Sequence, residues 1–242
     1  MKIISTQPSS LIEWPNHLSY VIFIAGCNLS CPFCYVPHLI REEAYNNIES
    51  IPQEKILRDL TERKGFVDAV CITGGEPTMH QELPQLLQTI KQQTNLPIRL
   101  ETNGTNPNII QQLIENKLVD SIALDIKNSK EKYQETTNSQ INFENIEKTI
   151  KIIKDSDIDY EFRTTLVPQL HTKEDIENIL DWINNIGNKK VKLYILQQFR
   201  SDLPNQQTLN PAFLEKGNYP ENEMKNIKEH INKSDLKIEV RV

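Results

Sequence analysis

Residues 19–34 read SYVIFIAGCNLSCPFC, an apolar run followed at once by a loop that carries three cysteines. The run 19–26 is rich in β-branched and aromatic residues, which is typical of a buried strand. The next clear helix is predicted near Pro52, so the connection is far longer than the ~2–6 residues usual after a strand. Since α/β proteins place their chemistry in loops at the carboxyl ends of parallel strands, this loop is the first candidate site.

Strand-like and helix-like stretches alternate along the rest of the chain. Strands are predicted at 67–73, 97–102, 119–125, 159–167 and 191–199. Apolar residues spaced three and four apart predict helices between them, around Leu83–Ile90, Ile109–Ile114, Ile146–Ile153 and Ile176–Ile183. Six β–α units predict an α/β fold, a partial (β/α)6 TIM-like barrel with parallel strands and outer helices. An open doubly wound sheet is the alternative.

Composition restricts the classes of protein that fit. The chain has 242 residues, a formal net charge of −6 and 38% hydrophobic residues, which is a globular composition and a length that suits one large domain or two small ones. Because the sequence shows no domain boundary, a single domain over 1–242 is predicted. The acidic balance argues against nucleic-acid binding. No apolar run reaches the ~18 residues of a membrane span, and no signal-peptide core precedes the fold, so a cytoplasmic protein is expected. After a long loop at 201–220, a helix at 221–232 and a strand at 236–242 complete the prediction.

The cysteines of the first loop have metal-ligand spacing. Cys27, Cys31 and Cys34 form the pattern C-x3-C-x2-C, and three thiolates on one loop can converge on one metal centre. A 4Fe–4S cluster bound by three cysteines keeps one iron open for an outside ligand, whereas structural zinc needs four protein ligands, which His38 could complete. Cys71 lies within a predicted strand and is expected to be a small buried hydrophobic residue.

The segment 27–34, with Phe33 before its last cysteine, resembles the signature of the radical S-adenosylmethionine (SAM) enzymes. That resemblance implies a cluster whose open iron is chelated by SAM. Gly74-Gly75-Glu76-Pro77 resembles the family motif that holds the methionine ammonium, and Glu76 is a candidate acceptor for it. The predicted cofactor-binding residues are Phe33, Gly74, Gly75, Glu76, Glu101, Asn103, Asp125, Lys127 and Arg163.

These residues fall at the carboxyl ends of the predicted strands, hence on one face of a barrel. Lys127 and Arg163 are expected to bind the carboxylate or ribose of SAM, because Arg is a good bidentate donor to carboxylates. Glu101 and Asp125 are acidic neighbours, and a monovalent cation shared by them is a further hypothesis. His171 and the other histidines outside the cysteine loop are expected to be structural or exposed.

The resemblance extends from Ser9 to about Phe213 and is closest to the glycyl-radical-enzyme activases, especially those of anaerobic ribonucleoside-triphosphate reductase. It rests on SLIEWPNHLSYVIFIAGCNLSCPFC, ITGGEPTMHQELPQLL, LETNGTNPNIIQQLI, VDSIALDIK, YEFRTTLVPQLHTKEDI and YILQQFR. It implies that flavodoxin or ferredoxin reduces the cluster. Cleavage of SAM then gives a 5′-deoxyadenosyl radical, which takes a hydrogen atom from a glycine Cα of the reductase.

The sequence departs from the activase pattern at three points. Tyr35 follows the last cysteine where activases often have His-Asn, Glu101 stands where Asp is usual, and no ferredoxin-type cysteine insert is present. One cluster is therefore expected. Two other functions stay open: a radical SAM enzyme acting on a small molecule, similar to 7-carboxy-7-deazaguanine synthase, and a non-enzymatic zinc or iron–sulfur module.

Overall fold

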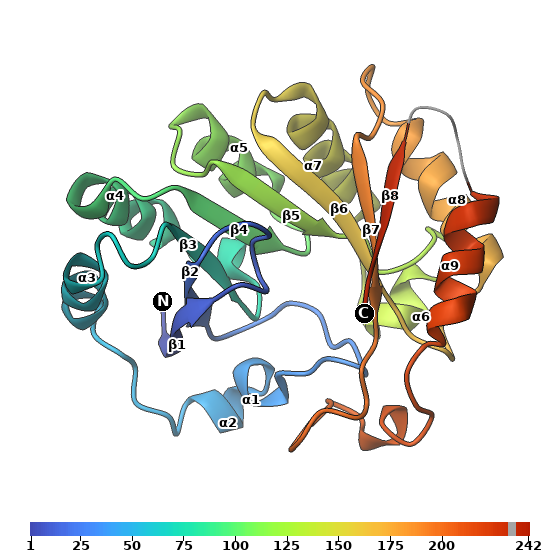
Figure 1. Ribbon diagram of the computed structural model, residues 1–242, viewed down its shortest axis with the longest axis horizontal. Coiled ribbons are helices and arrows are strands. Elements are labelled where there is room, and N and C mark those ends of the chain that lie inside the picture. Colours follow the sequence, from blue (N-terminus) through green and yellow to red (C-terminus); the bar gives the residue numbers. More distant parts are fainter. Residues whose placement is uncertain (232–235) are drawn as a thin grey trace. The chain divides into compact units, whose positions relative to one another are not determined.

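The computed structural model describes residues 1–231 and 236–242. Its strands follow the order of the chain, from β1 to β8, in one mostly parallel sheet (Figure 1). A doubly wound sheet reverses its strand order at a switch point. The sequential order therefore confirms the predicted (β/α) arrangement of a partial barrel against that alternative.

The chain divides into two compact units, which are described separately. Unit 1 comprises Met1–Asn28, His38–Thr102 and Asn106–Ala123, and unit 2 comprises Leu29–Pro37, Asn103–Thr105 and Leu124–Val242. The boundary falls inside strand β5 (Ser121–Asp125) and inside the cysteine loop. The predicted organisation as one domain stays a prediction.

Unit 1 contains strands β1 (Ile3–Ser10), β2 (Ser19–Ile24), β3 (Ala69–Gly74) and β4 (Ile98–Thr102). Strands β2, β3 and β4 are parallel, as predicted, with Ile24 opposite Gly74 and Cys71 opposite Arg99. Strand β1 pairs antiparallel with β2 and was not predicted. It carries polar residues and Pro8 in its exposed middle, so its sequence lacks the apolar pattern of a buried strand.

The helices of unit 1 bury the apolar residues that predicted them. Helix α3 (Gln53–Glu62) begins after Pro52, and α4 (Leu83–Thr94) and α5 (Pro107–Glu115) follow β3 and β4. The side chains of Leu83, Leu86, Leu87 and Ile90 are at most 1% exposed. The sequence did not predict α1 (Pro37–Ile40), α2 (Glu42–Tyr45) or η1 (Pro77–Met79), which are too short to show a helical period.

Unit 2 contains the parallel strands β6 (Asp159–Leu166), β7 (Leu193–Gln198) and β8 (Lys237–Arg241). Along β6 the side chains alternate: Tyr160 and Phe162 are buried apolar residues, and Glu161 and Arg163 lie on the opposite face. Arg241 makes two hydrogen bonds to the buried Glu161, at 2.7 and 2.6 Å. The polar face of these strands is thus organised by ion pairs.

Helices flank the strands of unit 2 (Figure 1). They are α6 (Tyr133–Thr137), α7 (Phe143–Asp155), α8 (Lys173–Asn184), α9 (Glu221–His230) and the short η2 (Pro211–Phe213) within the long loop. The helix predicted over 221–232 is α9, and position 232 lies outside the described residues. The last predicted strand is β8. Helix α6 was not predicted.

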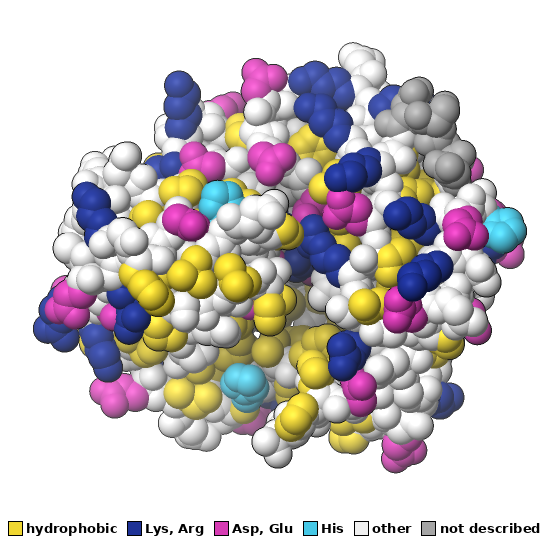
Figure 2. Space-filling view, in the orientation of Figure 1, with side chains coloured by type: hydrophobic (Ala, Val, Ile, Leu, Met, Phe, Trp, Pro, Cys, Tyr) yellow, Lys and Arg dark blue, Asp and Glu magenta, His cyan; other side chains and the backbone are white. Residues whose placement is uncertain are grey.

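Within the described ranges, no helix combines the length and the apolar character that crossing a membrane requires. On the face shown in Figure 2, acidic and basic side chains are interspersed among polar and apolar ones.

Helix α8 begins with the capping arrangement that the sequence Thr172–Asp175 indicates. Thr172 Oγ1 accepts a hydrogen bond from Asp175 N at 3.3 Å, and Asp175 Oδ2 accepts one from Thr172 N at 2.8 Å. This capping box pairs two backbone donors that the helix leaves without an internal acceptor.

Replacing Thr172 by Ala should lower the free energy of unfolding by about 1 kcal/mol, because the backbone N–H of Asp175 loses its side-chain acceptor. Urea denaturation of the variant measures this loss. Lys173→Ala, one residue further along the same helix, is the matched control and should stay within about 0.5 kcal/mol of the wild type. An equal effect of the two substitutions would contradict the capping role.

Candidate functional site

In unit 1 the glycine turn after β3 lies against the start of the cysteine loop. Gly75 N donates to Ile24 O at 2.8 Å, and Glu76 N donates to Gly26 O at 2.7 Å. A Cβ atom on Gly75 would lie 2.0 Å from Gly26 O, so only glycine permits this approach. The backbone beside Cys27 is thereby held to the end of β3.

The carboxylate of Glu76 is completely buried in unit 1. Its Oε1 accepts hydrogen bonds from Thr78 N at 3.0 Å, from Thr78 Oγ1 and from Thr102 Oγ1 at 2.7 Å. Glu76 therefore joins the turn to the end of β4. The sequence motif predicted an acceptor for a ligand ammonium, and this oxygen is engaged by the protein's own donors. The ligand contact stays a prediction.

Two other predicted residues have hydrogen-bond partners close in the fold. In unit 1, Glu101 Oε2 accepts from Thr73 Oγ1 at 2.8 Å, which links β4 to β3. In unit 2, Asn103 Oδ1 accepts from Thr105 N at 3.0 Å and from Thr105 Oγ1 at 2.7 Å. Asn103 thus forms a local turn, the usual role of Asn in such a position.

Unit 2 holds the second and third cysteines of the loop. Cys31 is buried, Cys34 is partly buried, and Cys34 N donates to Cys31 O at 3.0 Å. Burial raises the pKa of the Cys31 thiol to about 11, although the nearby Lys127 ammonium acts in the opposite direction. Burial raises the pKa of Cys34 as well. A metal centre would replace the protons that these thiols otherwise keep.

Asp125, Lys127 and Arg163 form one charged cluster in unit 2. Lys127 Nζ lies 2.9 Å from Asp125 Oδ2, and Arg163 Nε donates to Asp125 Oδ1. Burial alone would raise the pKa of Asp125, but Arg163 and Lys127 hold it well below its usual range. Asp125 in turn keeps the pKa of Lys127 above its ordinary value, against the effect of burial. Two cations and one carboxylate carry a net charge of +1, which favours an anionic ligand group.

His171 supports the backbone of Lys127 from the loop after β6. Its Nδ1 accepts from Val167 N at 3.0 Å, so its Nε2 carries the hydrogen and donates to Lys127 O at 2.8 Å. The ring is buried, and burial lowers its pKa below the ordinary value of 6.5. His171 is structural, as the sequence predicted, but no sequence signal showed that it positions a predicted binding residue.

The chemistry of the cysteine loop fits an iron–sulfur cluster. Cys27, Cys31 and Cys34 lie on one short loop and form no disulfide, and cysteine thiolates are the ligands of such clusters. The described residues contain no group of three His, Cys, Asp or Glu arranged to hold a single metal ion. In a 4Fe–4S cluster each thiolate binds a different iron atom, so the three sulfur atoms do not have to meet at a single ion. Cys71 is completely buried in β3, as expected.

Phe33 lies between the last two cysteines and is 6% exposed. Its ring centroid is 6.5 Å from that of Phe213 in η2. Both residues belong to unit 2, so Phe33 anchors the cysteine loop in an apolar contact. A contact of Phe33 with SAM stays a prediction.

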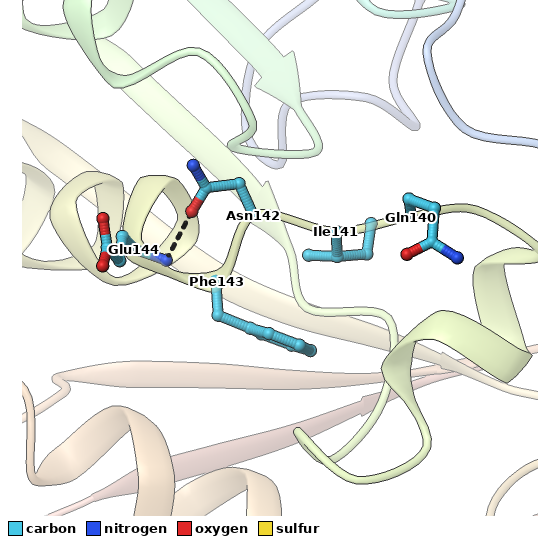
Figure 3. Close-up of a pocket in the computed structure, with 5 residues that line it drawn as sticks. All are labelled: Gln140, Ile141, Asn142, Phe143 and Glu144. Atoms are coloured by element: carbon cyan, nitrogen blue, oxygen red, sulfur yellow. Dashed lines mark hydrogen bonds between the residues drawn. The ribbon is translucent and has the colours of Figure 1, made fainter.

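A separate hollow in unit 2 contains none of the predicted residues. It is lined by residues 140–144 at the start of α7, where Asn142 Oδ1 accepts from Glu144 N at 3.0 Å (Figure 3). This bond is an ordinary helix N-cap. The hollow is therefore explained by the way α7 begins.

The His171 geometry predicts a pH-dependent stability. A lowered folded pKa means that, between this pKa and about 6.5, the unfolded chain binds more protons than the folded protein. Stability should therefore fall as pH drops below about 6.5. Unfolding free energies at pH 7.5 and 5.5 measure this, and His171→Gln should reduce the difference. An equal pH dependence in the variant would contradict a neutral buried His171.

Comparison with known proteins adds three findings. Residues 21–183 match the Radical SAM superfamily. A Methanocaldococcus jannaschii protein provisionally named as a glycyl-radical enzyme activating enzyme is 36% identical over 194 residues, 78% of this chain and 76% of that protein. The 7-carboxy-7-deazaguanine synthase of Clostridium acetobutylicum is 26% identical over 188 residues, 76% of this chain and 74% of that protein.

Among solved structures, QueE from Escherichia coli is similar with a TM-score of 0.60 at 15% identity, over 100% of this chain and 93% of that chain. At this identity the likeness concerns the fold alone. The superfamily match covers most of the chain and contains the cysteine loop, the glycine turn and the charged cluster. The chain therefore belongs to the radical SAM superfamily, whose members use a 4Fe–4S cluster and SAM.

Proposed function

We propose that this protein is a cytoplasmic activating enzyme that installs a glycyl radical in anaerobic ribonucleoside-triphosphate reductase. The whole chain, 1–242, acts as one radical SAM domain and receives its electron from flavodoxin or ferredoxin. The observation that carries the proposal is the 36% identity, over most of both chains, to a protein provisionally named as a glycyl-radical enzyme activating enzyme.

In the proposed reaction, Cys27, Cys31 and Cys34 bind the cluster as thiolates. When bound and reduced, the cluster supplies the electron that splits SAM into methionine and a 5′-deoxyadenosyl radical, which abstracts a hydrogen atom from the target glycine. Lys127 and Arg163, with a net positive charge beside Asp125, attract the carboxylate of SAM. No protein general base is required, since a hydrogen atom moves rather than a proton.

The backbone of the glycine turn supports this role. Gly75 and Glu76 donate to the carbonyls of Ile24 and Gly26, immediately before Cys27. The same turn that resembles the methionine-binding motif is therefore hydrogen bonded to the chain that carries the first cluster ligand. Glu101 and Asp125 as joint ligands of a monovalent cation are part of the proposal.

A second candidate is a radical SAM enzyme that acts on a small molecule. The 26% identity to a 7-carboxy-7-deazaguanine synthase, over similar shares of both chains, favours this alternative. Both candidates cleave SAM, so cleavage alone does not separate them. The substrate does: a protein glycine in one case and a small heterocycle in the other.

The deciding experiment mixes the anaerobically purified, reduced protein with SAM and a candidate anaerobic ribonucleotide reductase. A glycyl radical signal in the EPR spectrum, lost when the target glycine is replaced by Ala, supports the proposal. SAM cleavage with no radical on the reductase, together with turnover of the deazaguanine precursor, would favour the second candidate. Zinc without iron or acid-labile sulfide would indicate the non-enzymatic module.

Replacing Cys27, Cys31 or Cys34 by Ala should abolish both cluster binding and the formation of 5′-deoxyadenosine, because each removes one of three ligands. Cys71→Ala is the matched control: it removes a buried thiol from β3, and iron content and cleavage should persist. Iron, sulfide and 5′-deoxyadenosine are measured after anaerobic reconstitution. Full cleavage activity in any of the three loop variants would refute the assigned ligand set.

Gly75→Ala should lower the rate of SAM cleavage roughly 100-fold, the effect expected when a reacting group moves by about 1 Å. Its new Cβ cannot remain 2.0 Å from Gly26 O, so the turn must separate from the cysteine loop. Gly65→Asn is the control, because nothing lies within 4 Å of that position and Asn tolerates its positive φ. Wild-type cleavage by Gly75→Ala would show that the close approach is unimportant.

A further inference from the structure

In unit 2 the cysteine loop is held by a long loop that carries no recognisable motif. We call residues 201–218 the strap. Its two ends meet, since Ser201 N and Ser201 Oγ both donate to Asn218 Oδ1, at 2.7 and 3.0 Å. These two hydrogen bonds close the loop at its base.

Residues 209 and 210 of the strap are hydrogen bonded to backbone carbonyls of the cysteine loop. Leu209 N donates to Cys34 O at 3.0 Å, and Asn210 N donates to Pro32 O at 2.8 Å. Thr208 Oγ1 donates to Asn210 O at 2.8 Å, which stabilises this part of the strap. The carbonyl of a predicted cluster ligand is thus bound directly by the strap.

Tyr35 connects the same loop to the base of the strap. Its ring stacks on Phe199, with centroids 5.2 Å apart and an interplanar angle of 11°. Its hydroxyl accepts a hydrogen bond from Arg200 N, immediately before the strap begins. Tyr35 stands where the activases that the sequence resembles often have His.

The residue before Cys31 is fixed by the end of α6 and by the turn that follows it. Ser30 N is shared between Thr137 O at 3.1 Å and Ser139 Oγ at 3.0 Å. Cys31 and Cys34 therefore lie between two sets of contacts, one from α6 and one from the strap and Tyr35. Four of these contacts use backbone groups of the loop itself, so they fix its path rather than one side chain.

Such restraint matters because cluster ligands on a free loop lose conformational entropy on binding. A loop that is already in its bound path spends less free energy on ordering and binds more tightly.

We propose that Tyr35 is a positioning residue that, with the strap, holds Cys31 and Cys34 in the cluster-binding geometry. This inference rests on one part of the proposed function, namely that the cysteine loop binds an iron–sulfur cluster. It adds a role for the residue after the third cysteine and for a segment outside the shared motifs.

The test uses the full chain reconstituted anaerobically with iron and sulfide. Tyr35→Phe removes the hydroxyl and keeps the stacked ring, Tyr35→Leu removes both, and Asn218→Ala releases the base of the strap without touching the cysteine loop. Tyr45→Leu, in the short helix α2 of unit 1, is the control. The readouts are iron and sulfide per chain, the decay of the visible cluster absorbance in air, and the unfolding temperature of the apoprotein.

For Tyr35→Phe we expect the decay in air to accelerate roughly 2- to 12-fold, the range that one hydrogen bond contributes to an equilibrium. Tyr35→Leu should decay faster still, Asn218→Ala should change in the same direction, and Tyr45→Leu should match the wild type. If Tyr35→Leu fails to fold, Tyr35→Phe and Asn218→Ala decide.

Wild-type decay and cluster content in both Tyr35→Phe and Asn218→Ala would overturn the inference while leaving the proposed function intact. A wild-type protein that takes up no iron and sulfide at all would instead overturn the proposed function. A purely structural role of Tyr35 predicts a lower unfolding temperature of the apoprotein with unchanged decay in air, and that result would also overturn the inference.

Discussion

The candidate site of unit 1 depends on one close approach of two backbone segments. The turn after β3 donates two hydrogen bonds to the carbonyls of Ile24 and Gly26, and the absence of a side chain at Gly75 makes the approach possible. The parallel pairing of β2 with β3 places the two segments at the same strand ends. These hydrogen bonds fix the backbone at the start of the cysteine loop, immediately before Cys27.

In unit 2 the corresponding constraint is electrostatic, because the charged side chains of Asp125, Lys127 and Arg163 are largely buried. Asp125 has two cationic partners, and each ion pair offsets the cost of burying the others. Lys127 and Arg163 are therefore both paired with Asp125, and the cluster of three side chains still carries one net positive charge. His171 adds a neutral hydrogen bond to the backbone of Lys127, so the position of that ammonium group is fixed from the main chain as well.

Periodicity predicted most of the fold, whereas the ligand contacts that motif spacing predicted for the site residues stay predictions. The strands β2 to β8 and the longer helices have repeated apolar positions, and burial of those positions is what the pattern reports. Strand β1 and the helices α1, α2 and α6 were not predicted. A strand with an exposed polar middle lacks the apolar pattern of a buried strand, and a helix of four or five residues is stabilised by tertiary contacts rather than by its own sequence. The hydrogen bond from Thr102 to Glu76 was not predicted either, because the two residues are 26 positions apart in the sequence.

The same reasoning explains why the strap could not be recognised from sequence. Its contacts to Pro32 and Cys34 are made by the backbone N–H groups of Asn210 and Leu209, and any residue other than proline supplies such a donor. Motifs report side-chain chemistry, so a segment that acts through its main chain has none.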